Sequence, residues 1–199
     1  MAVSRRLVYT VSRLPMSTPN DDVLYVQAAL SGDTRAFGVL VDRYQTPVYN
    51  LARRMLGNSA DAEDLTQETF VLAYQNLKNL KVEQKFFSWL YAIALNQSRR
   101  CLRRQRSWLS LFDTSAQQLK LPPPDIEEKS VRTVLVEQML NSLNPVDRSL
   151  VILRYYDDLS YEDIAATVDM PLGTVKNRLH RCREQLYRKY QSEFNHETI

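Results

Sequence analysis

Hydrophobic residues recur at helical spacing through the first half of the chain. The clearest stripe joins Phe37, Leu40, Val41 and Tyr44, whose i, i+3, i+4, i+7 spacing is typical of a helix with one buried face. Pro47 either perturbs this helix or starts a new one. The same period predicts three further helices, over about residues 23–30, 60–77 and 86–104, the first of them with Val23, Val26 and Leu30 as its apolar positions. No segment alternates apolar and polar residues long enough to predict a strand, so residues 21–106 are predicted to form a helical bundle.

The pattern changes after this bundle. Three consecutive prolines, Pro122 to Pro124, cannot continue a helix and favour an extended chain, which predicts a linker over residues 107–129. Its first residues, SWLSLF, could equally be an end of the first domain that folds back onto it. Residues 1–20 are predicted to be a basic N-terminal arm or, alternatively, an upstream start with Met16 as the true first residue, and residues 193–199 a short tail.

Helical period returns over residues 130–192, which are predicted to form a second small domain. Asn144 and Pro145 suit the N-cap and first turn of one helix, and Ser160 with Asp163 suits the capping box of the next. The sequence VDMP then predicts a turn before a long terminal helix. The chain is therefore predicted to be all-α, with two small helical domains joined by a Pro-containing extended linker.

The terminal helix has one apolar stripe and one strongly basic surface. At about 100° per residue, the stripe that should face the core contains Val175, Leu179, Cys182 and Leu186. The polar positions around it are Thr174, Lys176, Asn177, Arg178, His180, Arg181, Arg183, Gln185 and Arg188, and glutamate appears once, as Glu184. A solvated helix would usually mix charges of both signs. The short turn before this helix instead predicts a helix-turn-helix whose second helix enters the major groove of DNA.

Bulk composition narrows the function classes. The 199 residues carry a formal net charge of only +3, so any nucleic-acid surface must be local. No apolar run approaches the roughly 20 residues that span a bilayer, which predicts a cytoplasmic protein without membrane insertion. The 2 cysteines lack metal-ligand spacing, and His180 and His196 are too isolated for a catalytic set. We therefore expect no metal, no cofactor and no enzymatic activity.

The segment from Leu143 to Leu186 resembles the C-terminal DNA-binding domain of extracytoplasmic-function sigma factors of the sigma-70 family. The matching sequences are DLSY, with Ile164 and Ala165 after it, and GTVK, with the spaced arginines that follow it. Asp169 stands where the family commonly has glycine, but aspartate tolerates a left-handed backbone. The resemblance implies contacts with the −35 promoter element from Thr174, Lys176, Asn177, Arg178, His180, Arg181 and Arg183.

The first half resembles the same family. FFSWLYAIALNQSRRCLRR is similar to the family's −10 helix, although Leu95 replaces a frequent arginine and Arg100 a frequent aspartate. The residues that the resemblance assigns to the −10 region are Asn79, Leu80, Lys81, Lys85, Phe86, Asn96, Arg99, Arg103 and Arg104. The connector over residues 79–85, backed by Phe86, would receive a flipped base, whereas Trp89 is predicted to pack in the core.

An acidic stripe on the third predicted helix suggests a different partner. Acidic side chains near a helix N-terminus are stabilised by the helix dipole. Glu68 lies too far along the helix for the dipole to explain its presence. With Asp61, Asp64, Leu65 and Gln67, it resembles the family's surface for core RNA polymerase. The resemblance implies docking on the β′ clamp helices, a second contact with the β flap, and an anti-sigma factor as regulator.

The resemblance implies an RNA polymerase sigma factor that recognises −35 and −10 promoter elements and promotes strand opening. Such elements lie about 17 base pairs apart, or roughly 58 Å of B-form DNA. A linker of some 23 residues reaches roughly 75 Å when extended, which is sufficient. The alternative is a helix-turn-helix regulator that binds an operator without polymerase. That alternative leaves the acidic helix and the connector of the first domain unexplained.

Overall fold

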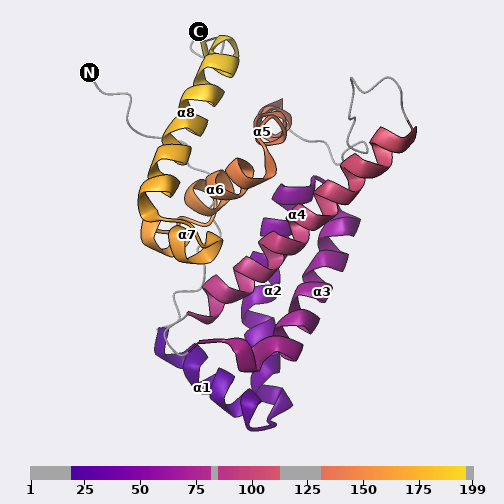
Figure 1. The fold of residues 1–199 in the computed structure, drawn as a ribbon, viewed down its shortest axis with the longest axis vertical. Helices are drawn as coiled ribbons and strands as arrows, with labels where there is room; N and C mark the ends of the chain where they lie inside the picture. The colour runs from indigo at the N-terminus through magenta and orange to yellow at the C-terminus, as the bar shows by residue number, and fades with distance from the viewer. Residues whose placement is uncertain (1–18, 82–84, 113–130, 196–199) are drawn as a thin grey trace.

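The structure, a computed structural model, describes residues 19–81, 85–112 and 131–195 (Figure 1). These residues form eight α-helices and one 3-10 turn, with no strand among them. The elements are α1 (Pro19–Leu30), α2 (Thr34–Leu56), α3 (Ser59–Asn76), η1 (Leu77–Asn79), α4 (Phe86–Phe112), α5 (Val131–Asn141), α6 (Pro145–Tyr155), α7 (Tyr161–Val168) and α8 (Leu172–Asn195). The predicted all-α class is confirmed.

Helices α1 to α4 form the N-terminal bundle. Leu40, Leu51 and Leu90 are fully buried, because the apolar stripes of α2 and α4 face each other and α3. Helix α2 runs without a break through Pro47, which answers the question that the sequence left open. It ends at Gly57, whose φ of 87° is the left-handed conformation that glycine adopts without strain.

Two features of this bundle differ from the sequence prediction. In α1, the expected stripe included Val23 and Leu30, yet both are about half exposed, while Val26 and Ala29 are buried. The buried face of so short a helix is set by its partner α2: Asp22 of α1 accepts hydrogen bonds from Arg43 and Tyr44 of α2, which fixes the rotation of α1.

Helix α4 is also longer than predicted. It continues to Phe112 rather than ending near residue 104, so the first six residues of the predicted linker are helical. No glycine or proline interrupts this stretch, and a helix propagates easily once it has formed. The three prolines lie outside the described residues.

Helices α5 to α8 form the C-terminal domain, whose caps match the sequence prediction. Asn144 accepts hydrogen bonds at its side-chain oxygen from the backbone N–H groups of Val146 and Asp147, at 3.1 and 3.0 Å. Ser160 caps α7 in the same way by accepting from the N–H of Asp163 at 3.0 Å. Asp169 has a φ of 53°, so the turn before α8 takes the predicted left-handed backbone.

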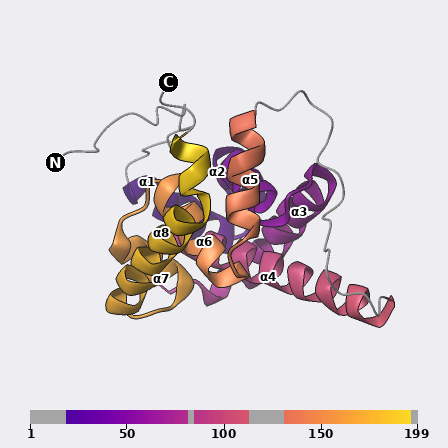
Figure 2. The same cartoon turned by 90° about the horizontal axis from the view of Figure 1, so that it is seen from above.

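The two domains lie directly against each other. In Figures 1 and 2, α6 and α7 rest on the side of α4, and α6 also reaches the end of α2. We call this contact the domain interface. It contains Arg54 and Met55 of α2, Lys85 before α4, Tyr91 and Arg99 of α4, Arg148 and Ser149 of α6, Tyr156 and Asp157 after α6, and Asp163 of α7.

Candidate nucleic-acid interface

The outward surface of α8 presents most of the side chains that the sequence assigned to the −35 element. Val175, Leu179 and Cys182 are buried against α6 and α7, which turns the opposite side of the helix to solvent. Burial also raises the pKa of the Cys182 thiol to about 11, so this cysteine is an inert core residue. The exposed candidates are Thr174, Lys176, Asn177, His180, Arg181 and Arg183.

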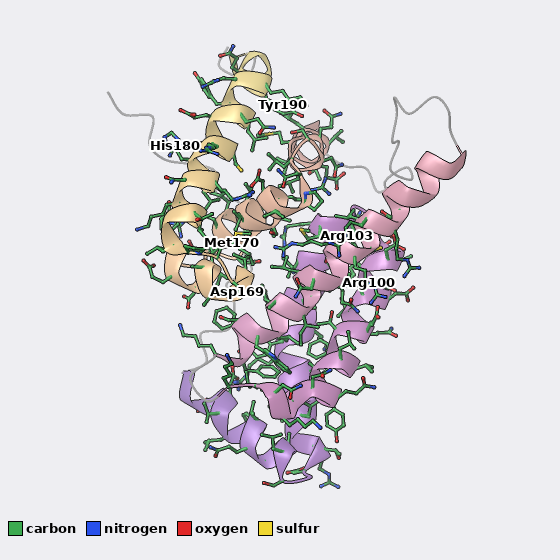
Figure 3. The ribbon with its side chains drawn as sticks, in the orientation of Figure 1. Arg100, Arg103, Asp169, Met170, His180 and Tyr190 are labelled. Carbon is green, nitrogen blue, oxygen red and sulfur yellow. The ribbon has the colours of Figure 1, made fainter. Side chains whose placement is uncertain are left out.

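Figure 3 shows side chains on the two sides of α8. His180 projects from the outer side, whereas Tyr190 points toward α5 and donates a hydrogen bond to the carbonyl of Gln138 at 3.2 Å. A groove helix must be held firmly on its inner face so that its outer side chains keep a fixed register. The Tyr190 contact extends that support about two turns beyond Arg183.

Arg178 is the exception among the predicted −35 residues. Its Nη1 lies 2.7 Å from Oδ1 of Asp147 in α6, and its side chain is 39% exposed. This ion pair ties α8 to α6, which packs behind it. Arg178 therefore has a partner within the domain, which sequence periodicity did not reveal because Asp147 is 31 residues away.

Tyr161 contacts one of the predicted −35 residues, a role that the sequence reasoning missed. Its ring in α7 lies 5.0 Å from the guanidinium carbon of Arg154 and 5.7 Å from Nζ of Lys176. Cations near an aromatic face are attracted to it at these distances. The ring thus positions Lys176, a predicted DNA contact, at the start of α8.

The predicted −10 residues are divided between solvent and core. Asn79, Lys81, Lys85, Asn96, Arg103 and Arg104 are exposed, and Leu80 is half-buried. Residues 82–84 of the connector lie outside the described residues. Phe86 is only 3% exposed and packs against Tyr44 and Trp89, with ring centroids 5.6 and 6.0 Å apart. Phe86 is thus a core residue, and Trp89 is partly buried against the core, as predicted.

Two of the predicted −10 cations contact the C-terminal domain. Nζ of Lys85 lies 2.7 Å from Oδ1 of Asp163, and Arg99 donates a hydrogen bond to Oγ of Ser149 at 2.9 Å. Burial, and then the nearby charge of Arg103, lowers the pKa of the Arg99 guanidinium. Burial raises the pKa of Asp163, but hydrogen bonds from Lys85 and Ser160 outweigh it, so the net shift is downward and the carboxylate stays charged.

The acidic stripe of α3 also divides into exposed and internal parts. Asp64, Gln67 and Glu68 are exposed along one side of the helix. Leu65 is only 5% exposed and belongs to the core. Asp61 is half-buried, and its Oδ2 accepts hydrogen bonds from Asn58 and Gln105 at 2.7 and 3.0 Å.

Two apolar side chains continue the exposed part of this stripe. Val71 is 54% exposed, and Tyr74, in the last turn of the helix, is 45% exposed. They follow Gln67 and Glu68 at helical spacing. The sequence reasoning followed only the acids, although apolar residues at i+3 and i+4 were a usable signal. The surface of α3 is thus acidic at its start and apolar farther along.

Neither a metal cluster nor a membrane span is found in the parts of the chain that the structure describes. No group of three or more His, Cys, Asp or Glu side chains is placed to hold a metal ion in residues 19–81, 85–112 and 131–195. Within the same ranges, no helix is both long and apolar enough to cross a bilayer.

Comparison with known proteins identifies relatives of both domains. The family model for sigma-70 region 2 matches residues 40–107, and that for sigma-70 region 4 matches residues 133–186. The chain is 32% identical over 173 residues to the ECF RNA polymerase sigma factor SigW of Bacillus subtilis (strain 168), covering 81% of this chain and 92% of that protein. It is 34% identical over 188 residues to the ECF RNA polymerase sigma-E factor of Escherichia coli (strain K12), covering 88% and 97%.

Solved structures show the same arrangement of helices. CnrH, solved in complex with the cytosolic domain of CnrY, aligns with a TM-score of 0.64 and 27% identity, covering 86% of this chain and 97% of that one. The sigma factor RpoE from Bartonella quintana, solved with the anti-sigma factor NepR, shares the fold at a TM-score of 0.61 and 23% identity, covering 76% and 94%. The region 2 match accounts for the first domain, which a stand-alone regulator would leave unexplained.

Proposed function

Since the chain belongs to the extracytoplasmic-function group of the sigma-70 family of RNA polymerase sigma factors, we propose a division of labour among its surfaces. Helix α8 reads the −35 element through its exposed polar side chains. The connector and α4 bind the −10 region, where the duplex opens. Helix α3 docks on core polymerase through Asp64, Gln67 and Glu68, and Val71 and Tyr74 extend that contact.

The observation that supports this division best is the separation of charge between the two domains. The exposed side chains at the start of α8 are basic or neutral, whereas those of α3 from Asp64 to Glu68 are acidic or neutral. DNA and a basic protein surface therefore attract different domains of the same molecule. A protein with this distribution can bind both partners at once.

Individual roles follow from the local contacts. Arg181, Asn177 and Lys176 are exposed near the start of α8, where residues of a groove helix reach base edges. Arg178 forms an ion pair with Asp147, so we assign Arg178 mainly to positioning α8. Phe86, which directly follows the connector in the sequence, anchors it to the core, and Arg103 and Arg104 contact phosphates. Leu65 and Asp61 hold the docking helix in place from within the bundle.

The remaining partners are proposed on the family resemblance. The C-terminal domain would contact the β flap and α3 the β′ clamp helices, and an anti-sigma factor would regulate both domains. The similar protein CnrH was itself solved with the cytosolic domain of another protein. We propose no catalytic activity and no cofactor for the chain, which would act in the cytoplasm where core polymerase and promoter DNA are found.

Transcription in vitro tests this function directly. The chain would be mixed with bacterial core polymerase and a library of promoter sequences, and the RNA starts would be sequenced. We expect starts that share an upstream and a downstream element and that require the chain. Arg181→Ala should reduce these starts, whereas Lys189→Ala, an exposed cation farther along α8, should not. A chain that leaves the start sites of core polymerase unchanged would contradict the proposal.

A further inference from the structure

Arg100 is an exposed cation in α4 that none of the surfaces assigned above includes. It stands where the sigma factor pattern commonly has aspartate, so the charge at this position is reversed. Its side chain forms no hydrogen bond or ion pair with another residue of the described ranges. In Figure 3, Arg100 lies on the side of α4 away from α6 and α7. A reversed charge at such a position indicates a partner outside the chain.

Helix α4 is also far more basic than the rest of the protein. Its 27 residues include five arginines and neither aspartate nor glutamate. The whole chain, by contrast, has 26 basic and 23 acidic residues. A helix face that is only solvated usually mixes both signs. Like charges three and four residues apart repel each other and oppose helix stability. Arginines crowded in this way therefore indicate a site for an anion.

Arg100 makes the exposed arginines of α4 into one surface. At about 100° per residue, Arg103 and Arg104 lie on either side of Arg100, within an arc of about 100° that also contains Asn96. All four side chains are exposed. Arg99 lies outside this arc, because it turns toward α6. We call Asn96, Arg100, Arg103 and Arg104 the α4 row. Without Arg100, the two remaining arginines would be separated around the helix.

The α4 row lies well away from the connector. The connector ends at Lys85, directly before α4, and the helical rise from Phe86 to Arg100 is about 21 Å at about 1.5 Å per residue. DNA that enters the connector and also reaches the row must therefore extend along α4 by about six base pairs, at about 3.4 Å each. The row lies toward the end of α4 that leads to the domain for the −35 element. The DNA beside it is thus the upstream, still paired part.

We propose that Arg100 binds a backbone phosphate of the duplex upstream of the −10 element and joins Arg103 and Arg104 in one anion-binding row. This inference rests on the proposed function, because it takes Arg103 and Arg104 to be phosphate contacts. Phosphate contacts read no bases, so Arg100 adds affinity that falls with salt concentration. Aspartate at this position would instead pair with the two arginines and repel the phosphate.

Forked promoter DNA, bound by the chain together with core polymerase, tests this contact. The promoter is taken from the transcription experiment, and its −10 element is left unpaired. One probe carries about 12 base pairs of duplex upstream, enough for the Arg100 phosphate but too short for the −35 element, and a second carries about 3. In fluorescence anisotropy, Arg100→Asp should weaken binding of the longer probe at least about threefold and leave the shorter probe unchanged.

Two further measurements separate a phosphate contact from a structural role. On the longer probe, Arg100→Ala should reduce the slope of log affinity against log salt concentration by about 0.9, the value for one phosphate. In thermal unfolding, Arg100→Asp should melt no lower than the wild type, because its carboxylate precedes Arg103 and Arg104 at helical spacing. Arg35→Asp is the matched control, since it makes the same charge change at an exposed position of the same domain. It should bind both probes as the wild type does.

Each outcome has a distinct meaning. Equal binding of the longer probe by Arg100→Asp and Arg35→Asp would overturn the inference. An equal loss on both probes, or a lower melting temperature for Arg100→Asp, would also overturn it. A wild-type chain that directs no transcription starts would contradict the proposed function itself and remove the inference with it. That result is obtained before any variant is compared, so the two failures are distinguishable.

Discussion

Replacing Asp157 with asparagine should stabilise the closed chain, and most strongly above neutral pH. Burial raises the pKa of Asp157 from its ordinary value of 3.8 to about 7, even though the nearby charge of Arg54 in α2 lowers it. Tyr91 of α4 also lies beside this carboxyl, and burial together with the charge of Asp157 raises the pKa of its hydroxyl. The carboxyl therefore prefers to be neutral wherever the domains are in contact.

The direction of the pH dependence follows from the two protonation states. The closed chain holds the Asp157 proton up to about pH 7, whereas an open or unfolded chain loses it near 3.8. Stability from this site is therefore fully present below the lower value and is lost as the pH rises through the upper one. At about 1.4 kcal/mol per pH unit, the total loss is about 4 kcal/mol as an upper limit. Less than half of it has accumulated near pH 5.

Thermal unfolding followed by circular dichroism measures this effect. Asp157→Asn keeps the shape of the side chain but cannot ionise, so its melting temperature should exceed that of the wild type more at pH 8 than at pH 5. A chain of this size gains roughly 2 to 4 °C for each kcal/mol. Asp158→Asn is the control, because the side chain of Asp158, the next residue, is 86% exposed. Asparagine also tolerates the φ of 50° at this position. An equal, pH-independent change in both variants would refute the reasoning.

Three further perturbations test other parts of the molecule. Asp64→Lys or Glu68→Lys should weaken binding to core polymerase in a pull-down and leave affinity for a −35 duplex unchanged. Glu63→Lys, at an exposed residue of the same helix, is the control. Normal binding of polymerase by both the Asp64→Lys and the Glu68→Lys chains would exclude the docking surface. Arg181→Ala should weaken binding of a −35 duplex by about 1 to 3 kcal/mol in fluorescence anisotropy if it bonds a guanine. Equal weakening on scrambled DNA would assign Arg181 to a phosphate. Ser160→Ala should destabilise the chain by about 1 kcal/mol in urea unfolding, because it removes the N-cap of α7; an unchanged midpoint would show that the cap contributes little.

Predictions from short-range rules were reliable where the structural feature depends only on residues close together in the sequence. The caps at Asn144 and Ser160 and the left-handed turn at Asp169 depend on residues only a few positions apart. The apolar stripe of α8 was equally predictable, because helical period places Val175 and Leu179 on one face regardless of what that face contacts. The helix-turn-helix and the outward basic surface follow from these local rules.

Sequence reasoning failed where a distant partner decides the environment of a side chain. Val23 has the right spacing for a buried stripe, but the bonds of Asp22 to α2 rotate it into solvent. Leu65 and Asp61 were assigned to a docking surface by type, yet one is buried and the other is bonded to Gln105, which lies 44 residues away. The spacing of residues along one helix does not reveal contacts of this kind.

The sequence by itself therefore determined the helices, most of their ends, the two-part organisation and the family to which the chain belongs, since each depends on local spacing or on recognisable motifs. Only the tertiary structure decided that the domains rest against each other, that Arg148 reaches the end of α2, and that Lys85 and Arg99 are occupied by the C-terminal domain. The physical reason is that these contacts join residues 50 to 93 positions apart. Their free energies depend on burial and on the ends of other helices, which a pattern along the chain does not encode.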